Sequence, residues 1–101
     1  MPLLKICDIQ AGMRNIEVVG RITEISQRRH VLTKFGPADV ASAILRDDTG
    51  SIAVNLWRQQ IDSVSEGGMV RIINAFAKVY NDRLELNIGQ NGQIVAVKDN
   101  E

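Results

Sequence analysis

Apolar and polar residues alternate along most of this 101-residue chain, as they do in strands that bury one face. The alternation predicts five strands, over Ile16–Thr23, Val40–Arg46, Ser51–Arg58, Met69–Tyr80 and Arg83–Ile88, with Gln93–Val97 extending the sheet. Helical spacing predicts a short helix or turn within Leu4–Met13 and a short helical connection over Gln59–Val64. The segment Gln27–Asp39 is polar and basic and contains Gly36-Pro37, so we expect a long hairpin loop there.

Five strands with a short helix between the third and the fourth predict an all-β fold, a five-stranded Greek-key barrel of the OB type. The length fits one domain, residues 1–101, with a core of about 6–97 and a short polar C-terminal end. A closed barrel also leaves no strand edge exposed. A small open sandwich has the same number of strands and stays an alternative.

Composition narrows the class of protein. The formal net charge is zero, 45% of the residues are hydrophobic, and no apolar run reaches the length of a membrane span. The single Cys7 fits a reducing compartment, and we expect it to be a small buried residue rather than a reactive thiol. One cysteine and one histidine exclude the usual structural zinc sites. We therefore predict a cytoplasmic protein, associated with the nucleoid, that needs no cofactor.

Strand parity predicts where Trp57 lies. In the third strand the aliphatic set Ile52, Val54 and Leu56 must face the core, so Trp57, with the opposite parity, is placed on the solvent side. Packing of Trp57 under a loop or the short helix remains the alternative interpretation.

The fourth strand needs one extra residue. Val70 and Ile72 point inward, but the next apolar set has the opposite parity, and a bulge near Ile73-Asn74 would reconcile the two. The inward set then comprises Ala75, Ala77 and Val79 and, in the fifth strand, Leu84, Leu86 and Ile88. The outward set comprises Phe76, Lys78 and Tyr80 and, in the fifth strand, Arg83, Glu85 and Asn87.

Three of the four aromatic residues, Trp57, Phe76 and Tyr80, thus fall on outward faces, and the core must be almost entirely aliphatic. Outward aromatic residues are typical of proteins that stack the bases of single-stranded nucleic acid, largely without regard to sequence. Cations lie near them or in the first hairpin loop, and the phosphate contacts predicted from them are Arg28, Lys34, Arg58, Lys78 and Arg83.

Several short segments form a recognisable pattern: Thr33-Lys34, Ala43–Ile52, Val54–Trp57, Ser65–Gly67, Val70–Ile72, Asn74–Phe76 and Leu84–Gly89. They resemble the archaeal single-stranded-DNA-binding proteins with one simple OB-fold, which are related to replication protein A and the sensor-of-ssDNA proteins. The resemblance covers roughly Ile6 to Val95. The resemblance implies that Trp57, Phe76 and Tyr80 stack on bases. Family members also carry a glycine-rich tail that ends in acids. This chain ends with Lys98–Glu101. We therefore expect either that the tail is absent or that the chain is one domain of a longer replication protein.

The resulting prediction is a monomeric, non-enzymatic protein that binds single-stranded DNA in replication, recombination or repair, with other replication or repair proteins as further partners. RNA binding by the same face and a protein-interaction OB domain stay open as alternatives. A remote alternative is a retroviral-type aspartic protease, because Asp48–Ser51 contains the active-site triplet of those enzymes. Arg46-Asp47 stands where that enzyme class needs apolar residues, and no glycine-rich flap is evident before Gly89.

Overall fold

The computed structural model describes residues 3–97, apart from the side chain of residue 90. The predicted polar end, Lys98–Glu101, lies outside the described residues. The elements in chain order are η1 (Ile6–Asp8), β1 (Ile16–Ile25), β2 (Arg29–Thr33), β3 (Gly36–Asp47), β4 (Gly50–Trp57), α1 (Gln59–Asp62), β5 (Met69–Tyr80) and β6 (Arg83–Val97). Within residues 3–97, no helix is long and apolar enough to cross a membrane.

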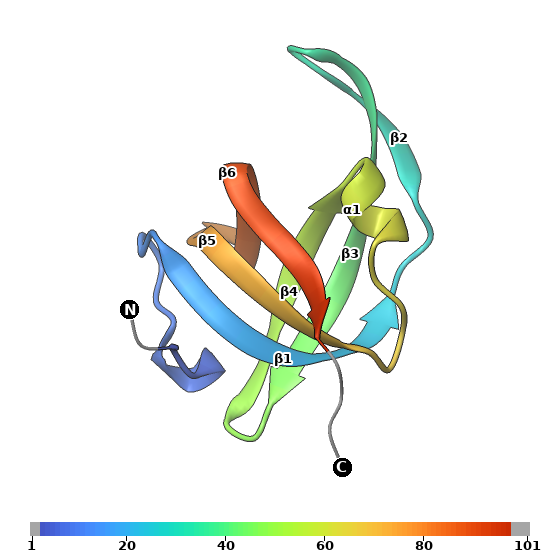
Figure 1. Cartoon of the computed structure of the whole chain (residues 1–101). Helices are drawn as coiled ribbons and strands as arrows, with labels where there is room; N and C mark the ends of the chain where they lie inside the picture. The colour runs from blue at the N-terminus through green and yellow to red at the C-terminus, as the bar shows by residue number, and fades with distance from the viewer. Residues whose placement is uncertain (1–2, 98–101) are drawn as a thin grey trace.

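The sheet closes into a barrel through β1 (Figure 1). The strand order is β1-β5-β6-β4-β3-β2, and β1 also pairs with β3. The first part of β1 pairs with β5 and its second part with β3, and the change of partner occurs at Arg21. A Cβ atom at the neighbouring Gly20 would lie 2.8 Å from the carbonyl oxygen of Arg46. Only glycine permits this close approach of the two strands. The pairing of β1 with both β5 and β3 confirms the predicted closed five-stranded barrel.

The bulge predicted in the fourth strand is present at Asn74. The register of β5 against β6 shifts between Ile73 and Ala75, and Asn74 adopts a φ of 60°. Ile72 and Ala75 are consequently both buried although they are three residues apart. Phe76 and Tyr80 then lie on the outer side of the barrel and are exposed.

The core of the described residues is aliphatic, as predicted. The side chains with no solvent exposure include Ile16, Ile22, Leu45, Leu56, Ile72 and Leu86. At one end, Ile6 and Ile9 of the N-terminal segment join this core, but Cys7 between them is exposed. The expectation of a buried Cys7 is wrong, because the η1 turn directs residues three apart toward the barrel and the intervening ones toward solvent.

The predicted long loop over Gln27–Asp39 is wrong. This segment forms a regular antiparallel ribbon of β2 and the first part of β3, paired from Arg29↔Val40 to Thr33↔Gly36. Most of its side chains are exposed, so it lacks the alternation by which the other strands were predicted. The ribbon extends beyond the barrel and curves over the end at which α1 lies (Figure 1).

Two further expectations need correction at the ends of strands. Val79 was expected to face the core, but it is 52% exposed because the last residues of β5 extend past the barrel with the β5–β6 turn. The fifth predicted strand and its extension form one continuous strand, β6, which pairs with β5 on both sides of Asn74.

Candidate nucleic-acid interface

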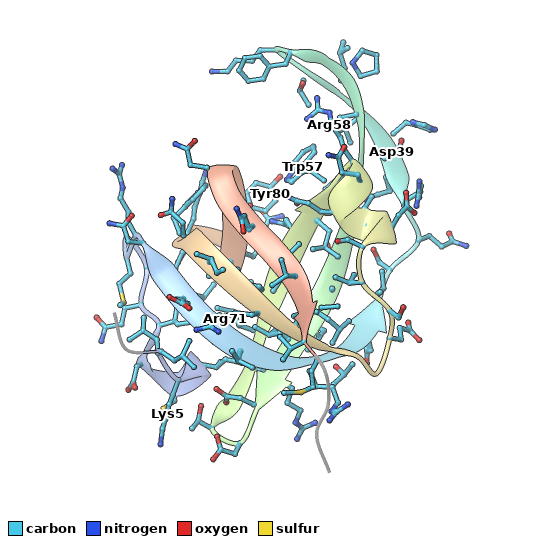
Figure 2. The ribbon with its side chains drawn as sticks, viewed as in Figure 1. Lys5, Asp39, Trp57, Arg58, Arg71 and Tyr80 are labelled. Atoms are coloured by element: carbon cyan, nitrogen blue, oxygen red, sulfur yellow. The ribbon has the colours of Figure 1, made fainter. Side chains whose placement is uncertain are left out.

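A groove runs between the β2–β3 ribbon and the outer side of β4, β5 and β6. Its volume is about 680 Å³, in the range of sites that hold small ligands. We call it the first groove, and it is lined by Arg29, Val31, Leu32, Thr33, Val40, Ser42, Asn55, Trp57, Lys78, Tyr80, Asn81, Arg83, Glu85 and Asn87. Trp57 and Tyr80 both lie at this end of the barrel, whereas Lys5 and Arg71 lie at the other end (Figure 2).

A second groove adjoins the first. It is lined by Phe35, Trp57, Arg58, Gln59, Gln60, Ser63, Ile88, Gly89, Gly92, Gln93, Ile94 and Val95. Trp57 lines both grooves and is half-buried. The outward position predicted for Trp57 is therefore correct, and its ring lies where the two grooves meet.

The backbone around Trp57 is held by specific hydrogen bonds. Its N–H donates to the side-chain oxygen Oε1 of Gln60, at 2.9 Å. The next residue, Arg58, adopts a φ of 55° and a ψ of −126°, which L-residues rarely adopt and which costs about 1–3 kcal/mol. The N–H of Arg58 donates to the carbonyl oxygen of Asp39, at 2.9 Å. These contacts turn the chain sharply from β4 into α1 and hold the ring of Trp57 at the groove.

The other two predicted aromatic residues are both exposed but occupy different places. Tyr80 is 61% exposed and lines the first groove with Trp57. Phe76 lies further along β5, opposite Asn87, and lines neither groove. Its ring atom Cε1 lies 3.5 Å from the position that a Cβ atom on Gly89 would occupy. The structure thus brings Trp57 and Tyr80 to one groove and leaves Phe76 beside it.

Four of the five predicted cations lie on or near the grooves. Lys78 and Arg83 line the first groove and Arg58 lines the second. Lys34 is at the tip of the ribbon, where its Nζ atom lies 5.4 Å from the centre of the Phe35 ring. A basic lining can therefore coexist with a net charge of zero.

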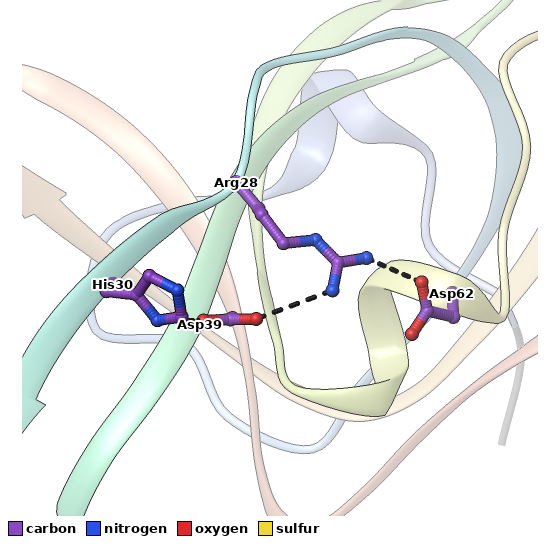
Figure 3. Close-up of polar contacts among 4 residues, drawn as sticks. All are labelled: Arg28, His30, Asp39 and Asp62. Atoms are coloured by element: carbon purple, nitrogen blue, oxygen red, sulfur yellow. Dashed lines mark hydrogen bonds and ion pairs between the residues drawn. The ribbon is translucent and has the colours of Figure 1, made fainter.

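Arg28 lines neither groove, and its guanidinium is engaged by two carboxylates (Figure 3). Its Nη2 donates to Asp62 of α1 at 2.5 Å, and its Nη1 lies 3.4 Å from Asp39 of β3. The hydrogen bond to Asp62 is the main cause that raises the pKa of the Arg28 guanidinium. Asp39 also contacts His30, with 2.5 Å between Oδ1 and Nδ1. Arg28 thus connects the base of the ribbon to α1, and this position does not favour a phosphate contact.

The floor of the first groove carries a polar network that strand parity did not reveal. Glu85 faces outward, as predicted, but only 8% of it is exposed. Asn55 Nδ2 donates to Glu85 Oε1 at 2.9 Å and to Asn87 Oδ1 at 3.1 Å. Arg83 Nη2 lies 3.4 Å from Glu85 Oε2. Facing outward therefore does not mean exposure here, because neighbouring strands cover the carboxylate.

The ribbon contributes apolar residues that the sequence interpretation missed. Leu32 is 84% exposed and lines the first groove, and Phe35 is 80% exposed and lines the second. The available signal was an aromatic residue beside Gly36-Pro37 in an otherwise polar segment, where no core is at hand to bury it.

Comparison with known proteins identifies the family. Residues 9–96 match the family described as "Single-stranded DNA binding protein Ssb-like, OB fold". The chain belongs to this family. Membership confirms the predicted resemblance and the OB-type barrel, and it agrees with a binding protein rather than an enzyme. Within residues 3–97, no cluster of three or more potential metal ligands is present.

Individual relatives extend this comparison. The chain is 30% identical over 95 residues to "Single-stranded DNA binding protein Ssb" of Saccharolobus solfataricus, an alignment that covers 94% of this chain and 64% of the relative. It is 31% identical over 96 residues to "Replication factor A" of Methanothermobacter thermautotrophicus, covering 94% of this chain but 12% of that protein. The solved OB domain of Ta0387 from Thermoplasma acidophilum has a TM-score of 0.84 and 27% identity, covering 98% of this chain and 90% of that one. The Ssb-like chain thus spans less than two thirds of both curated relatives.

Proposed function

We propose that this Ssb-like chain binds single-stranded DNA across the two grooves, as one OB-fold unit of about residues 6–97, in DNA replication, recombination or repair. The observation that carries this proposal is the position of Trp57, half-buried at the meeting point of both grooves. The names of the family and of the Saccharolobus solfataricus relative support single-stranded DNA as the ligand, and the name of the Methanothermobacter thermautotrophicus relative supports a role in replication.

Base stacking supplies most of the affinity in this proposal. Trp57 and Tyr80 offer ring faces in the first groove, and Phe76 offers another beside it. Phe35 on the ribbon lines the second groove together with Trp57, so we add it to the stacking residues. Each base–aromatic contact contributes about 1–3 kcal/mol and tolerates every base, because each base has a π-face.

Phosphate contacts supply the remaining affinity and make it salt-dependent. We assign them to Arg58, Lys78 and Arg83, which line the grooves, and to Lys34 at the tip of the ribbon. Arg28 is not included, because Asp62 and Asp39 already engage its guanidinium. Four phosphate contacts on a single strand predict a slope of log K against log salt of about −3.

The deciding experiment follows the fluorescence of Trp57, the only tryptophan, during titration with oligo-dT, with a duplex and with RNA of the same length. We expect quenching by oligo-dT that saturates and weakens steeply with salt, and much weaker binding of the duplex. If none of the three nucleic acids quenches the fluorescence of Trp57, the proposal is overturned. Stronger binding of RNA would favour the RNA alternative, and salt-independent binding of a protein partner would favour the protein-interaction alternative.

We further propose that the chain is monomeric. A single chain already supplies both grooves and the stacking residues. Sedimentation with and without oligo-dT tests this proposal, and a stable dimer in the absence of DNA would contradict it.

A further inference from the structure

Glu85 is the one charged side chain that is buried within residues 3–97. It lies on the floor of the first groove, which also contains Trp57 and Tyr80. A carboxylate beneath a groove that binds a polyanion repels the phosphates. The carboxylate is compatible with this position if the groups facing it are bases, whose edges carry hydrogen-bond donors.

The hydrogen bonds of the network leave capacity for such a ligand. An ionised carboxylate has about four acceptor sites. Glu85 uses Oε1 for Asn55 at 2.9 Å, and Oε2 lies 3.4 Å from Arg83, a long contact. Asn55 also donates to Oδ1 of Asn87 at 3.1 Å, which leaves the amide NH₂ of Asn87 as a donor. Among residues 3–97, this NH₂ donates to no acceptor, and Asn87 lines the first groove.

We propose that Glu85 and Asn87 read the edge of one stacked base, and that this position favours cytosine over thymine. Glu85 accepts from the N4 amino group of cytosine, a pairing known for Glu and Asp side chains. The NH₂ group of Asn87 donates to N3 or to O2 of the same cytosine, because both of these atoms are hydrogen-bond acceptors. Thymine carries the O4 carbonyl oxygen where cytosine carries the amino group. Two acceptors would then face each other with no proton between them.

This inference rests on the proposed function and refines it. Stacking on Trp57 and Tyr80 remains tolerant of sequence, and the selectivity is limited to the base above the Asn55–Glu85–Asn87 network. The effect on homopolymers is correspondingly modest.

The experiment compares oligo-dC with oligo-dT of equal length, at constant salt and pH about 7.5, by quenching of Trp57. We expect the wild-type protein to bind oligo-dC about fivefold more tightly, at the low end of the discrimination given by a good base contact. This comparison needs no variant to fold. Equal affinities, or tighter binding of oligo-dT, would overturn base reading.

Glu85→Gln tests the assigned residue. The variant keeps the shape of the side chain but replaces one acceptor oxygen with an NH₂ donor, which suits O4 of thymine. We expect the preference for oligo-dC to disappear or reverse. If the variant binds both oligonucleotides more tightly by the same factor, Glu85 acts through its charge alone and the proposal is wrong.

Asp82→Asn is the matched control for charge. Asp82 is exposed in the β5–β6 turn and does not line the first groove, and asparagine tolerates its φ of 62°. We expect this variant to change both affinities equally and to keep the preference for oligo-dC. Loss of the preference in the control would also contradict base reading. Failure to bind either oligonucleotide would instead refute the proposed function, and the two failures are therefore distinguishable.

Discussion

The two ends of the β3–β4 hairpin use polar residues in opposite ways. At the turn, the carboxylate of Asp47 is fully engaged by the protein itself. Its Oδ1 accepts from the N–H of Thr49 at 2.7 Å, from the hydroxyl of Thr49 at 2.6 Å and from the N–H of Gly50 at 3.2 Å. Its Oδ2 accepts from the N–H of Ile6 at 2.9 Å, which ties η1 to the turn.

Trp57, at the other end of the same hairpin, is half-buried between the two grooves. Beside β4, Glu85 and Asn87 of β6 line the first groove, and the hydrogen bonds among Asn55, Glu85 and Asn87 leave further acceptor and donor positions unused. The comparison separates a structural end from a binding end. It also explains Asp48–Ser51, the segment that suggested a protease: it belongs to a hairpin turn whose threonine holds Asp47.

The largest effect should come from the core beneath the binding end. Leu56 has no solvent exposure, and Leu56→Ala should lower the free energy of unfolding by about 2–5 kcal/mol through lost burial and a residual cavity. That is a large part of the total for a small domain. Chemical denaturation measures the loss. An unchanged denaturation midpoint would show that the inner face of β4 has been wrongly assigned.

The adjacent residue should show the opposite behaviour. Trp57→Ala should weaken binding of oligo-dT by about 1–3 kcal/mol, or about 5- to 150-fold. Because the ring is only half-buried, the free energy of unfolding should fall by only about 1 kcal/mol. The variant has no tryptophan, so fluorescence anisotropy of labelled oligo-dT measures the affinity. Full affinity in a folded Trp57→Ala protein would remove the central stacking residue.

The structural end should respond to acid. Burial alone would raise the pKa of Asp47, but the hydrogen bonds from Thr49, Ile6 and Gly50 together outweigh it and hold the pKa below the ordinary 3.8. The stabilisation that depends on the ionised carboxylate is therefore complete above pH 3.8 and is lost as the pH falls through the lower folded-state value. Asp47→Asn should cost about 1 kcal/mol at neutral pH, and this deficit should shrink in acid.

Asp48→Asn is the control for that measurement, because Asp48 is exposed in the same turn. It should leave the stability at neutral pH nearly unchanged and keep the loss of stability in acid that is due to Asp47. Thermal unfolding from pH 2 to 7 measures all three proteins. A deficit for Asp47→Asn that grows in acid would contradict the assigned sign.

The smallest effect should appear in the salt dependence of binding. Lys78→Gln removes a cation of the first groove, so the slope of log K against log salt should become shallower by about 0.7. Arg28→Gln should leave the slope unchanged, because this guanidinium is engaged by Asp62 and Asp39. Titrations at four salt concentrations test the pair. Equal flattening by both substitutions would return Arg28 to the phosphate contacts.

Much of this fold could be predicted because alternation is a local property of a strand. Leu56 and Trp57 point to opposite faces for the same reason that any two consecutive strand residues do. The bulge at Asn74 was also visible, since the inward parity changes between Ile72 and Ala75. The ribbon was missed because apolar and polar residues do not alternate in its sequence: Val31 and Leu32 are adjacent, and within Gln27–Asp39 only Ala38 is buried.

The sequence by itself therefore determined the strands of the barrel, the aliphatic core and the outward side of Trp57, because these follow from alternation along the chain. Only the tertiary structure decided which polar groups are free. Arg28 meets Asp62 across 34 positions of the chain, and Asn55 meets Glu85 across 30. Burial and ion pairing depend on which distant segments the barrel brings together, so a side chain's parity states its direction but not the groups that it meets there.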